Sequence, residues 1–163
     1  GILGWPDSHA DWNRPGIMLY GASPFAVDVA AASALRPAMT FEAEVIALRD
    51  VPAGDAVGYG GRWVAERPSK IATLAAGYAD GYPRHAPDGM PTFVNGHIAP
   101  IAGTVSMDMI TIDVTDHPEV AIGDLAELWG QNVSVNDVAK RAGTISYELL
   151  TRVSPRVPRR HTR

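Results

Sequence analysis

The sequence predicts a mainly β protein, and three observations carry this prediction. Sixteen glycines and thirteen prolines are spread along the chain and divide it into short apolar stretches with tight connections. One face of residues 41–47 is apolar, with Glu42 and Glu44 on the other, as in a half-buried strand; the apolar face comprises Phe41, Ala43, Val45 and Ala47. Asn95-Gly96 separates two apolar stretches, and this dipeptide favours a two-residue hairpin turn because both residues tolerate positive φ.

The N-terminal segment departs from this pattern. Residues 15–21 form a short continuous apolar run, which is typical of a parallel strand covered on both faces. Residues 26–35 are rich in alanine, and we expect a linker or a short helix because Pro37 disfavours helix in the residue before it. A domain boundary is therefore expected near residue 38, with one segment over 1–38 and a second over 39–163.

At least six strands and two short helices are expected after this boundary. Ser134 followed by Asp137 resembles a capping box, and Gly143 is a suitable end for the first helix. Residues 146–150 are expected to form one or two further helical turns. The expected strands cover residues 39–49, 58–63, 70–76, 92–94, 97–99, 105–114 and 124–129.

Length and composition limit the class of protein. A chain of 163 residues fits one domain, or one domain with part of a neighbour. Its 46% hydrophobic and 20% charged residues argue against disorder. No apolar run approaches the roughly 20 residues that span a bilayer, so we expect a soluble protein with no membrane partner. The chain begins at Gly1 as if inside a longer protein, and a partial chain is expected.

Charge and residue usage argue against several function classes. The net charge is −4, and the arginines cluster only near the C-terminus, so no nucleic acid partner is expected. The absence of cysteine excludes disulfides and thiolate chemistry. The histidines lack the spacing of metal ligands, so we expect no metal site. The arginines are Arg156, Arg159, Arg160 and Arg163, and the histidines are His9, His85, His97, His117 and His161.

Tyrosines in glycine-rich segments are the candidates for chemistry. Tyr59 lies among Gly58, Gly60 and Gly61, whose spacing fits neither a dinucleotide-binding loop nor a P-loop. Glycine permits close approach of the backbone to a ligand. A tyrosine is nevertheless more often a packing residue, because an ordinary phenol has a pKa near 10 and is protonated at neutral pH. Both interpretations stay open on chemistry alone.

Five motifs together resemble the alanine racemase family in order and spacing, over essentially the whole chain. The motifs are RPGIMLYG at 14–21, VGYG at 57–60, GYADGYPR at 77–84, PIAGTVSMDM at 100–109 and YELLTR at 147–152.

The resemblance implies a fold, a cofactor and a partner. In that family an N-terminal (β/α)8 barrel holds pyridoxal 5'-phosphate, and the C-terminal β domain of the other subunit in a head-to-tail homodimer closes the site. Residues 1–38 would then be the end of the barrel, with its last strand, and residues 39–163 a β-barrel or Greek-key-like domain. The implied reaction interconverts L-alanine and D-alanine in the cytoplasm, which supplies D-alanine for peptidoglycan.

The resemblance also implies roles for three residues that face the substrate. Tyr59 matches the tyrosine base that moves the Cα proton on one face of the cofactor-bound substrate, opposite a lysine on the other face. Tyr78 matches a residue that narrows the entrance, and the backbone N–H of Met107 matches a donor to the substrate carboxylate.

Four further residues match cofactor-binding positions. Arg14 corresponds to the arginine that faces the pyridine nitrogen of the cofactor. Without the resemblance, this arginine would be interpreted as part of a surface ion pair. The backbone N–H groups of Gly16 and Ile17, and the phenol of Tyr147, correspond to groups that bind the phosphate.

The lysine that would hold the cofactor is absent. Lys70 and Lys140 are the two lysines, and neither lies in the family's lysine motif. The resemblance therefore implies that this chain alone does not racemise alanine. Two alternatives stay open: a racemase of broader substrate range, and a non-catalytic β domain for dimerisation or ligand binding.

Overall fold

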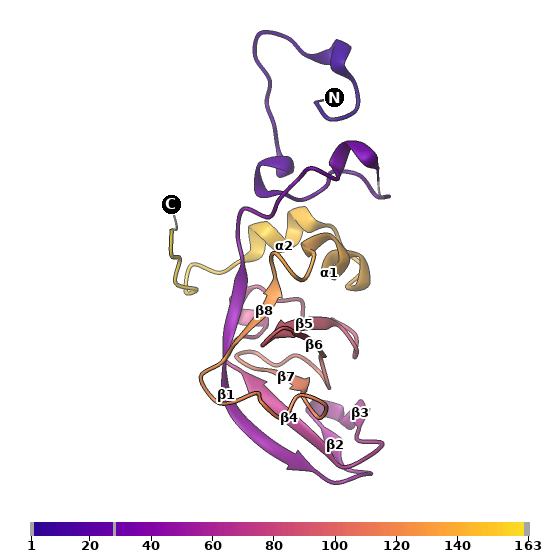
Figure 1. The fold of residues 1–163 in the computed structure, drawn as a ribbon, viewed down its shortest axis with the longest axis vertical. Helices are drawn as coiled ribbons and strands as arrows, with labels where there is room; N and C mark the ends of the chain where they lie inside the picture. The colour runs from indigo at the N-terminus through magenta and orange to yellow at the C-terminus, as the bar shows by residue number, and fades with distance from the viewer. Residues whose placement is uncertain (1, 28, 162–163) are drawn as a thin grey trace.

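The computed structural model describes residues 2–27 and 29–161; Gly1 and Arg163 lie outside the described residues. The molecule is elongated, with the N-terminal segment at one end and strands β2 and β3 at the other (Figure 1). The strands are β1 (Phe41–Val51), β2 (Ala56–Val57), β3 (Trp63–Val64), β4 (Ser69–Leu74), β5 (Pro91–Val94), β6 (His97–Pro100), β7 (Ile110–Asp113) and β8 (Leu125–Trp129).

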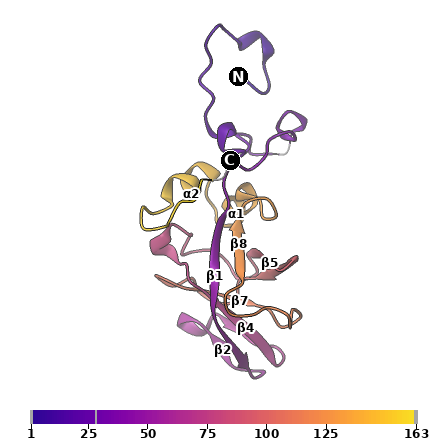
Figure 2. The ribbon, with the colours of Figure 1, turned by 60° about the vertical axis from the view of Figure 1, so that its left-hand side comes forward.

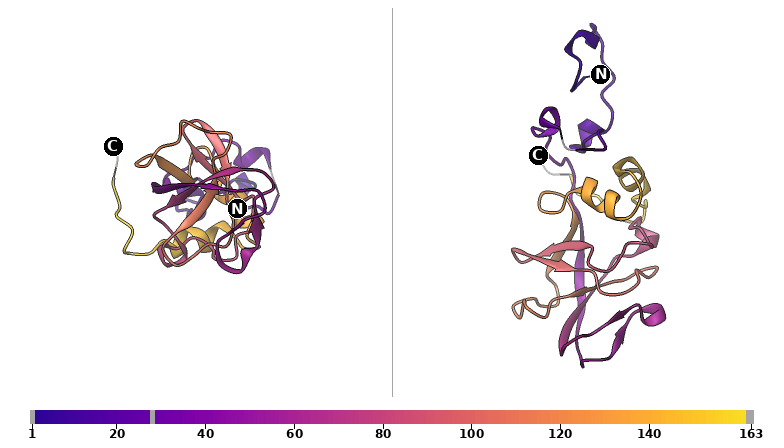
Figure 3. Two further views of the ribbon diagram at one scale, coloured as in Figure 1. Left: turned by 90° about the horizontal axis from the view of Figure 1, so that it is seen from below. Right: turned by 90° about the vertical axis from the view of Figure 1, so that its right-hand side faces the viewer.

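Six strands form one antiparallel sheet in the order β6-β5-β8-β1-β4-β7, and β2 pairs with β3 separately. A bridge between Ile101 and Ile112 connects the two edges, so the sheet nearly closes on itself (Figure 3). The hairpin prediction is confirmed: Asn95 and Gly96 have φ of 48° and 88°. The mainly β prediction is confirmed as well.

The core fills the space that the curled sheet encloses. In β1, Phe41, Ala43 and Val45 are buried and the residues between them exposed, as the period-two pattern predicts. Ala47, expected on the same buried face, is exposed because the register shifts at a bulge between Val45 and Ala47. Trp129 at the end of β8 meets Phe41 edge to face at 4.7 Å between ring centroids and stacks on Tyr82 at 5.8 Å. Burial raises the pKa of the Tyr82 phenol, so this tyrosine is a neutral packing residue.

Two helices lie between the sheet and the N-terminal segment (Figure 2). They are α1 (Val135–Arg141) and α2 (Ser146–Arg152), as the sequence predicts. The Ser134 hydroxyl accepts a hydrogen bond from the N–H of Asn136 at 3.2 Å, which caps α1. Neither these helices nor any other helix of the described residues has the length and apolar character of a membrane span.

The expected strand over residues 15–21 is wrong, because this segment contains the 3-10 helix η2 (Ile17–Tyr20). A parallel strand needs neighbours for its N–H and C=O groups, and the described part of the chain offers none here. The other 3-10 turns are η1 (Pro6–Ser8), η3 (Ala30–Ala32), η4 (Tyr59–Gly61) and η5 (Tyr78–Asp80).

The expected strand over residues 58–63 is also wrong. Gly58, Gly60 and Gly61 all have positive φ, which ends the strand and forms η4 between β2 and β3. The strand expected over 105–114 shortens to β7, because residues 102–109 turn away from the sheet to meet the η4 and η5 loops.

Candidate functional site

Four of the predicted site residues line one hollow at the N-terminal end of the molecule. Arg14, Gly16 and Ile17 come from the segment that leads into η2, and Tyr147 comes from the start of α2. The hollow has a volume of about 410 Å³, which is within the range of small-molecule sites. The fold therefore brings together residues that are more than 130 positions apart, from Arg14 to Tyr147.

The hydrogen-bonding groups of this hollow are suited to an anion. Within residues 2–27 and 29–161, the N–H groups of Gly16 and Ile17 donate to no other group. The space where a Gly16 Cβ would lie is empty to 4 Å, so a ligand can approach the backbone there. Arg14 adds a permanent positive charge and Tyr147 a hydroxyl donor.

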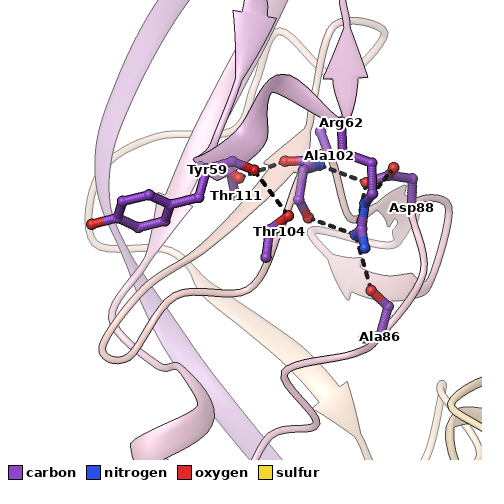
Figure 4. A network of polar contacts seen from close by, with 8 residues as sticks. Tyr59, Arg62, Ala86, Asp88, Ala102, Thr104 and Thr111 are labelled. Carbon is purple, nitrogen blue, oxygen red and sulfur yellow. Dashed lines mark hydrogen bonds and ion pairs between the residues drawn. The ribbon is translucent and has the colours of Figure 1, made fainter.

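Tyr59 lies in the η4 loop at the opposite end of the molecule, between β2 and β3 (Figure 1). Its side chain is 73% exposed and points away from the polar network behind it (Figure 4). The Thr104 hydroxyl donates to the Tyr59 carbonyl at 3.2 Å, which attaches the η4 loop to residues 102–104. The phenol therefore projects from the surface, on a loop whose backbone is anchored to residues 102–104.

Arg62 fixes this loop to the rest of the domain (Figure 4). Its guanidinium donates to Asp88 at 2.9 and 3.2 Å, to the Ala86 carbonyl at 3.0 Å and to the Gly103 carbonyl at 3.2 Å. Asp88 also accepts the N–H of Gly103 at 2.8 Å. The segments that contain Arg62, Asp88 and Gly103 are distant in sequence and thus meet on the inner side of the Tyr59 loop.

Tyr78 and Met107 lie on two loops that hydrogen-bond to each other. The Tyr78 N–H donates to the Ser106 carbonyl at 3.0 Å, and the Ala79 N–H donates to the Met107 carbonyl at 2.9 Å. A side chain at Gly77 would lie 2.4 Å from the Met107 oxygen, so the close approach requires glycine there. Among described residues, the Met107 N–H has no acceptor, and its side chain is exposed.

The predicted site residues thus fall into two groups. Arg14, Gly16, Ile17 and Tyr147 share the hollow, and Tyr59, Tyr78 and Met107 are not among its lining residues. Lys70 in β4 and Lys140 in α1 do not line the hollow either.

Sequence reasoning missed Arg62, Asp88 and Thr104, which hold the Tyr59 loop in place. Arg62 and Asp88 are 26 positions apart, and no local pattern indicates that they pair. The glycines around Tyr59 indicated a turn but did not indicate what the turn contacts.

Residues 38–161 match the family model described as the C-terminal domain of alanine racemase. The alanine racemase of Chromohalobacter salexigens is 54% identical over 159 residues, which are 98% of this chain and 44% of that protein.

Solved structures give the same assignment. The biosynthetic alanine racemase of Pseudomonas aeruginosa has a TM-score of 0.93 at 53% identity, covering 99% of this chain and 45% of that one. The alanine racemase of Bartonella henselae, described with covalently bound pyridoxal phosphate, has a TM-score of 0.78 at 38% identity, covering 88% of this chain and 39% of that one. The chain spans less than half the length of these relatives.

Proposed function

This chain belongs to the alanine racemase family, and we propose that it forms the C-terminal part of a racemase that interconverts L-alanine and D-alanine with pyridoxal 5'-phosphate. The observation that carries the proposal is the convergence of Arg14, Gly16, Ile17 and Tyr147 on one hollow. The resemblance assigned these four residues to one cofactor, and they come from both ends of the chain.

The donors in the hollow fit the chemistry of this cofactor. A phosphate group needs hydrogen-bond donors, and the N–H groups of Gly16 and Ile17 are available together with the Tyr147 hydroxyl. Arg14 is permanently protonated, so it can donate to a ring nitrogen but cannot accept a proton from it. A pyridine nitrogen that faces Arg14 would therefore stay unprotonated.

The cofactor, when bound, supplies an electron sink for the pair that the Cα–H bond of alanine leaves behind. Arg14 would limit how far that sink withdraws electrons, which would favour return of the proton to Cα over loss of the amino group. Tyr147 and the Gly16 and Ile17 backbone would hold the phosphate. Tyr59 would take the Cα proton on its oxygen as a phenolate, or return it as a phenol, on one face, and a lysine outside this chain would serve the other face.

The two residue groups support a head-to-tail homodimer. The hollow lies at the N-terminal end of the molecule, and the Tyr59 phenol projects into solvent at the far end. A phenol that acts as a base must be desolvated and close to Cα. We therefore assign Arg14, Gly16, Ile17 and Tyr147 to one active site, and Tyr59, Tyr78 and Met107 to the site of the partner. In this assignment residues 1–38 complete the barrel and residues 39–163 form the β domain.

A Tyr59→Phe substitution in the racemase that contains this chain tests the role of the phenol. Racemisation in both directions should fall by about 10²–10⁴-fold, because a positioned acid or base contributes that much. Exchange of the Cα hydrogen with solvent deuterium should persist for one enantiomer, through the lysine, and be lost for the other. NMR of each enantiomer in D₂O measures both.

Tyr20→Phe is the matched control, because Tyr20 is also exposed but is not among the matched site residues. Its racemisation should stay at the unsubstituted level. If Tyr59→Phe leaves racemisation intact in both directions, the catalytic assignment fails and the non-catalytic β domain is the better interpretation.

This chain by itself is expected to bind the cofactor weakly and not to racemise alanine. Neither Lys70 nor Lys140 reaches the hollow, so no covalent link to the cofactor forms there. An absorbance band of lysine-linked pyridoxal phosphate in the isolated chain would contradict this.

The position of Tyr78 supports a narrow substrate range. The backbone of its loop hydrogen-bonds to the Met107 segment, so Tyr78 and the Met107 N–H, which would meet a substrate carboxylate, are held on adjoining loops. Rates of racemisation with alanine, serine and lysine as substrates distinguish the two racemase hypotheses. We expect a strong preference for alanine, whereas comparable rates with lysine would favour the enzyme of broader substrate range.

A further inference from the structure

Two histidines and a glutamate gather at the edge where the sheet nearly closes. The ligand atoms of His97, His117 and Glu119 all lie within 4.8 Å of one another. His97 is the first residue of β6, and the other two lie in the loop between β7 and β8. The spacing of histidines predicted no metal site, and it could not reveal this cluster because the sheet register creates it.

The register of the sheet explains the juxtaposition. Ile101 pairs with Ile112 in antiparallel sense, so residues before Ile101 lie alongside residues after Ile112. His97 and His117 are therefore adjacent, with ring centroids 4.6 Å apart and planes at 15°. The two stacked rings must turn about their side-chain torsions for both lone pairs to point at one ion. Val94 pairs with His97 across the β5–β6 hairpin, and the His117 N–H donates to the Val114 carbonyl at 3.0 Å. Both backbone positions are thus fixed before any ligand binds.

One pair of these ligand atoms has a spacing close to that of two zinc ligands. His97 Nε2 lies 3.6 Å from Glu119 Oε1, which exceeds a hydrogen-bond length. Two ligands at 2.0–2.2 Å from a tetrahedral Zn²⁺ are separated by about 3.3 Å, close to that spacing.

A further contact orients one of the imidazoles. His117 Nε2 lies 3.3 Å from the Ile98 carbonyl oxygen. A carbonyl only accepts hydrogen bonds, so Nε2 carries the proton and Nδ1 keeps its lone pair. Metal-binding histidines are commonly oriented by such a bond from the second ring nitrogen to a carbonyl. In this tautomer, Nδ1 of His117 is the nitrogen that would bind the ion.

We propose that His97, His117 and Glu119 form a zinc-binding site that joins the β5–β6 hairpin to the loop between β7 and β8. Two imidazoles and one carboxylate leave a fourth position for water. The site is independent of the proposed racemase function, since none of the three belongs to either group of predicted site residues. Its effect is structural, because it links the two edges of the curled sheet.

Calorimetric titration of the untagged chain with Zn²⁺ tests the site. The chain should bind one equivalent, and His97→Ala and Glu119→Gln should each weaken binding at least about tenfold. His85→Ala is the control, because His85 is an exposed histidine outside the cluster, and it should change the Kd less than about twofold. Saturating Zn²⁺ should raise the Tm of the unsubstituted chain and leave that of His97→Ala unchanged.

The proposal is overturned by no Zn²⁺ binding up to millimolar concentration, by undiminished binding in His97→Ala, or by equal weakening in His85→Ala. If His97→Ala fails to fold by circular dichroism, Glu119→Gln decides the question alone, because that substitution keeps the size of the exposed side chain and removes only its charge. Unchanged zinc affinity in that variant would also contradict the site.

Discussion

At the scale of single residues, Arg62 and Asp88 show what holds the Tyr59 loop. Asp88 accepts hydrogen bonds from Arg62 and from the Gly103 N–H, and Arg62 donates further to two carbonyls. The Arg62–Asp88 bonds are exposed, whereas the bonds to the two carbonyls and from the Gly103 N–H are partly buried, so water replaces these three poorly. The sequence revealed Tyr59 through its glycines and its motif, but the pairing behind it depends on long-range packing.

Asp88→Ala should reduce the free energy of unfolding by about 2 kcal/mol, because hydrogen bonds to a charged acceptor are lost and the Gly103 N–H is left without its partner. Urea denaturation of the chain measures the change.

Asp116→Ala removes an exposed partner of Arg67 and is the matched control, with an expected change below about 0.5 kcal/mol. Equal effects of the two substitutions would show that the Arg62 contacts do not stabilise the domain.

At the scale of elements, local signals predicted some segments and failed at others. The Asn95-Gly96 hairpin and the α1 cap were predictable because their geometry is set by adjacent residues. The η4 loop was predicted as a strand, because glycines between apolar residues also occur in strands. The positive φ values of these glycines exclude a strand, and the sequence does not give them. The shape of this loop follows from contact with residues 102–104, which sequence alone does not place.

Gly103→Ala should separate the η4 loop from this contact. Its Cβ would lie 2.6 Å from the Val57 carbonyl oxygen at a φ of +94°, so both a clash and a strained backbone are introduced. Gly89→Ala introduces only the strain, because the space around Gly89 is open at a φ of +80°. Thermal unfolding should show about 1 kcal/mol of destabilisation for Gly89→Ala and at least about 2 kcal/mol more for Gly103→Ala; similar values for both would argue against tight docking.

The C-terminal segment is tied to η5 by an ion pair that predicts a pH dependence. Desolvation would raise the pKa of Asp80, but hydrogen bonds from Arg156, at 2.6 and 3.0 Å, and from the Gly77 N–H outweigh it and lower the pKa. A carboxyl with a lowered folded pKa stabilises the fold above its unfolded pKa of about 3.9, and the contribution is lost as pH falls through the folded pKa.

Arg156→Met should therefore destabilise the chain at pH 7, and its difference from the unsubstituted chain should shrink as pH falls below about 4. Denaturation at several pH values measures this. Arg152→Met, which breaks an exposed i,i+4 pair, should show little difference at either pH. A pH-independent deficit for Arg156→Met would mean that Asp80 is not the group involved.

At the scale of the whole molecule, the two ends carry different parts of the proposed chemistry. The hollow with Arg14 lies at the N-terminal end, and the Tyr59 loop lies beyond the curled sheet at the other end. The resemblance implied these residues and their division into two groups, and the distance between the groups follows from how β1 and the helices extend the molecule. A single chain of this shape does not bring both groups together, so the proposed reaction would need two subunits.

Subunit complementation tests this most directly. Tyr59→Phe and Arg14→Ala variants of the full racemase, each inactive alone, are unfolded together, refolded at equal amounts and assayed for alanine racemisation. If the two residues serve different sites, half of the dimers are mixed and one of their two sites is intact, so about one quarter of the unsubstituted activity should return. No recovery above the separate variants, with mixed dimers verified by mass spectrometry, would contradict the division into two sites.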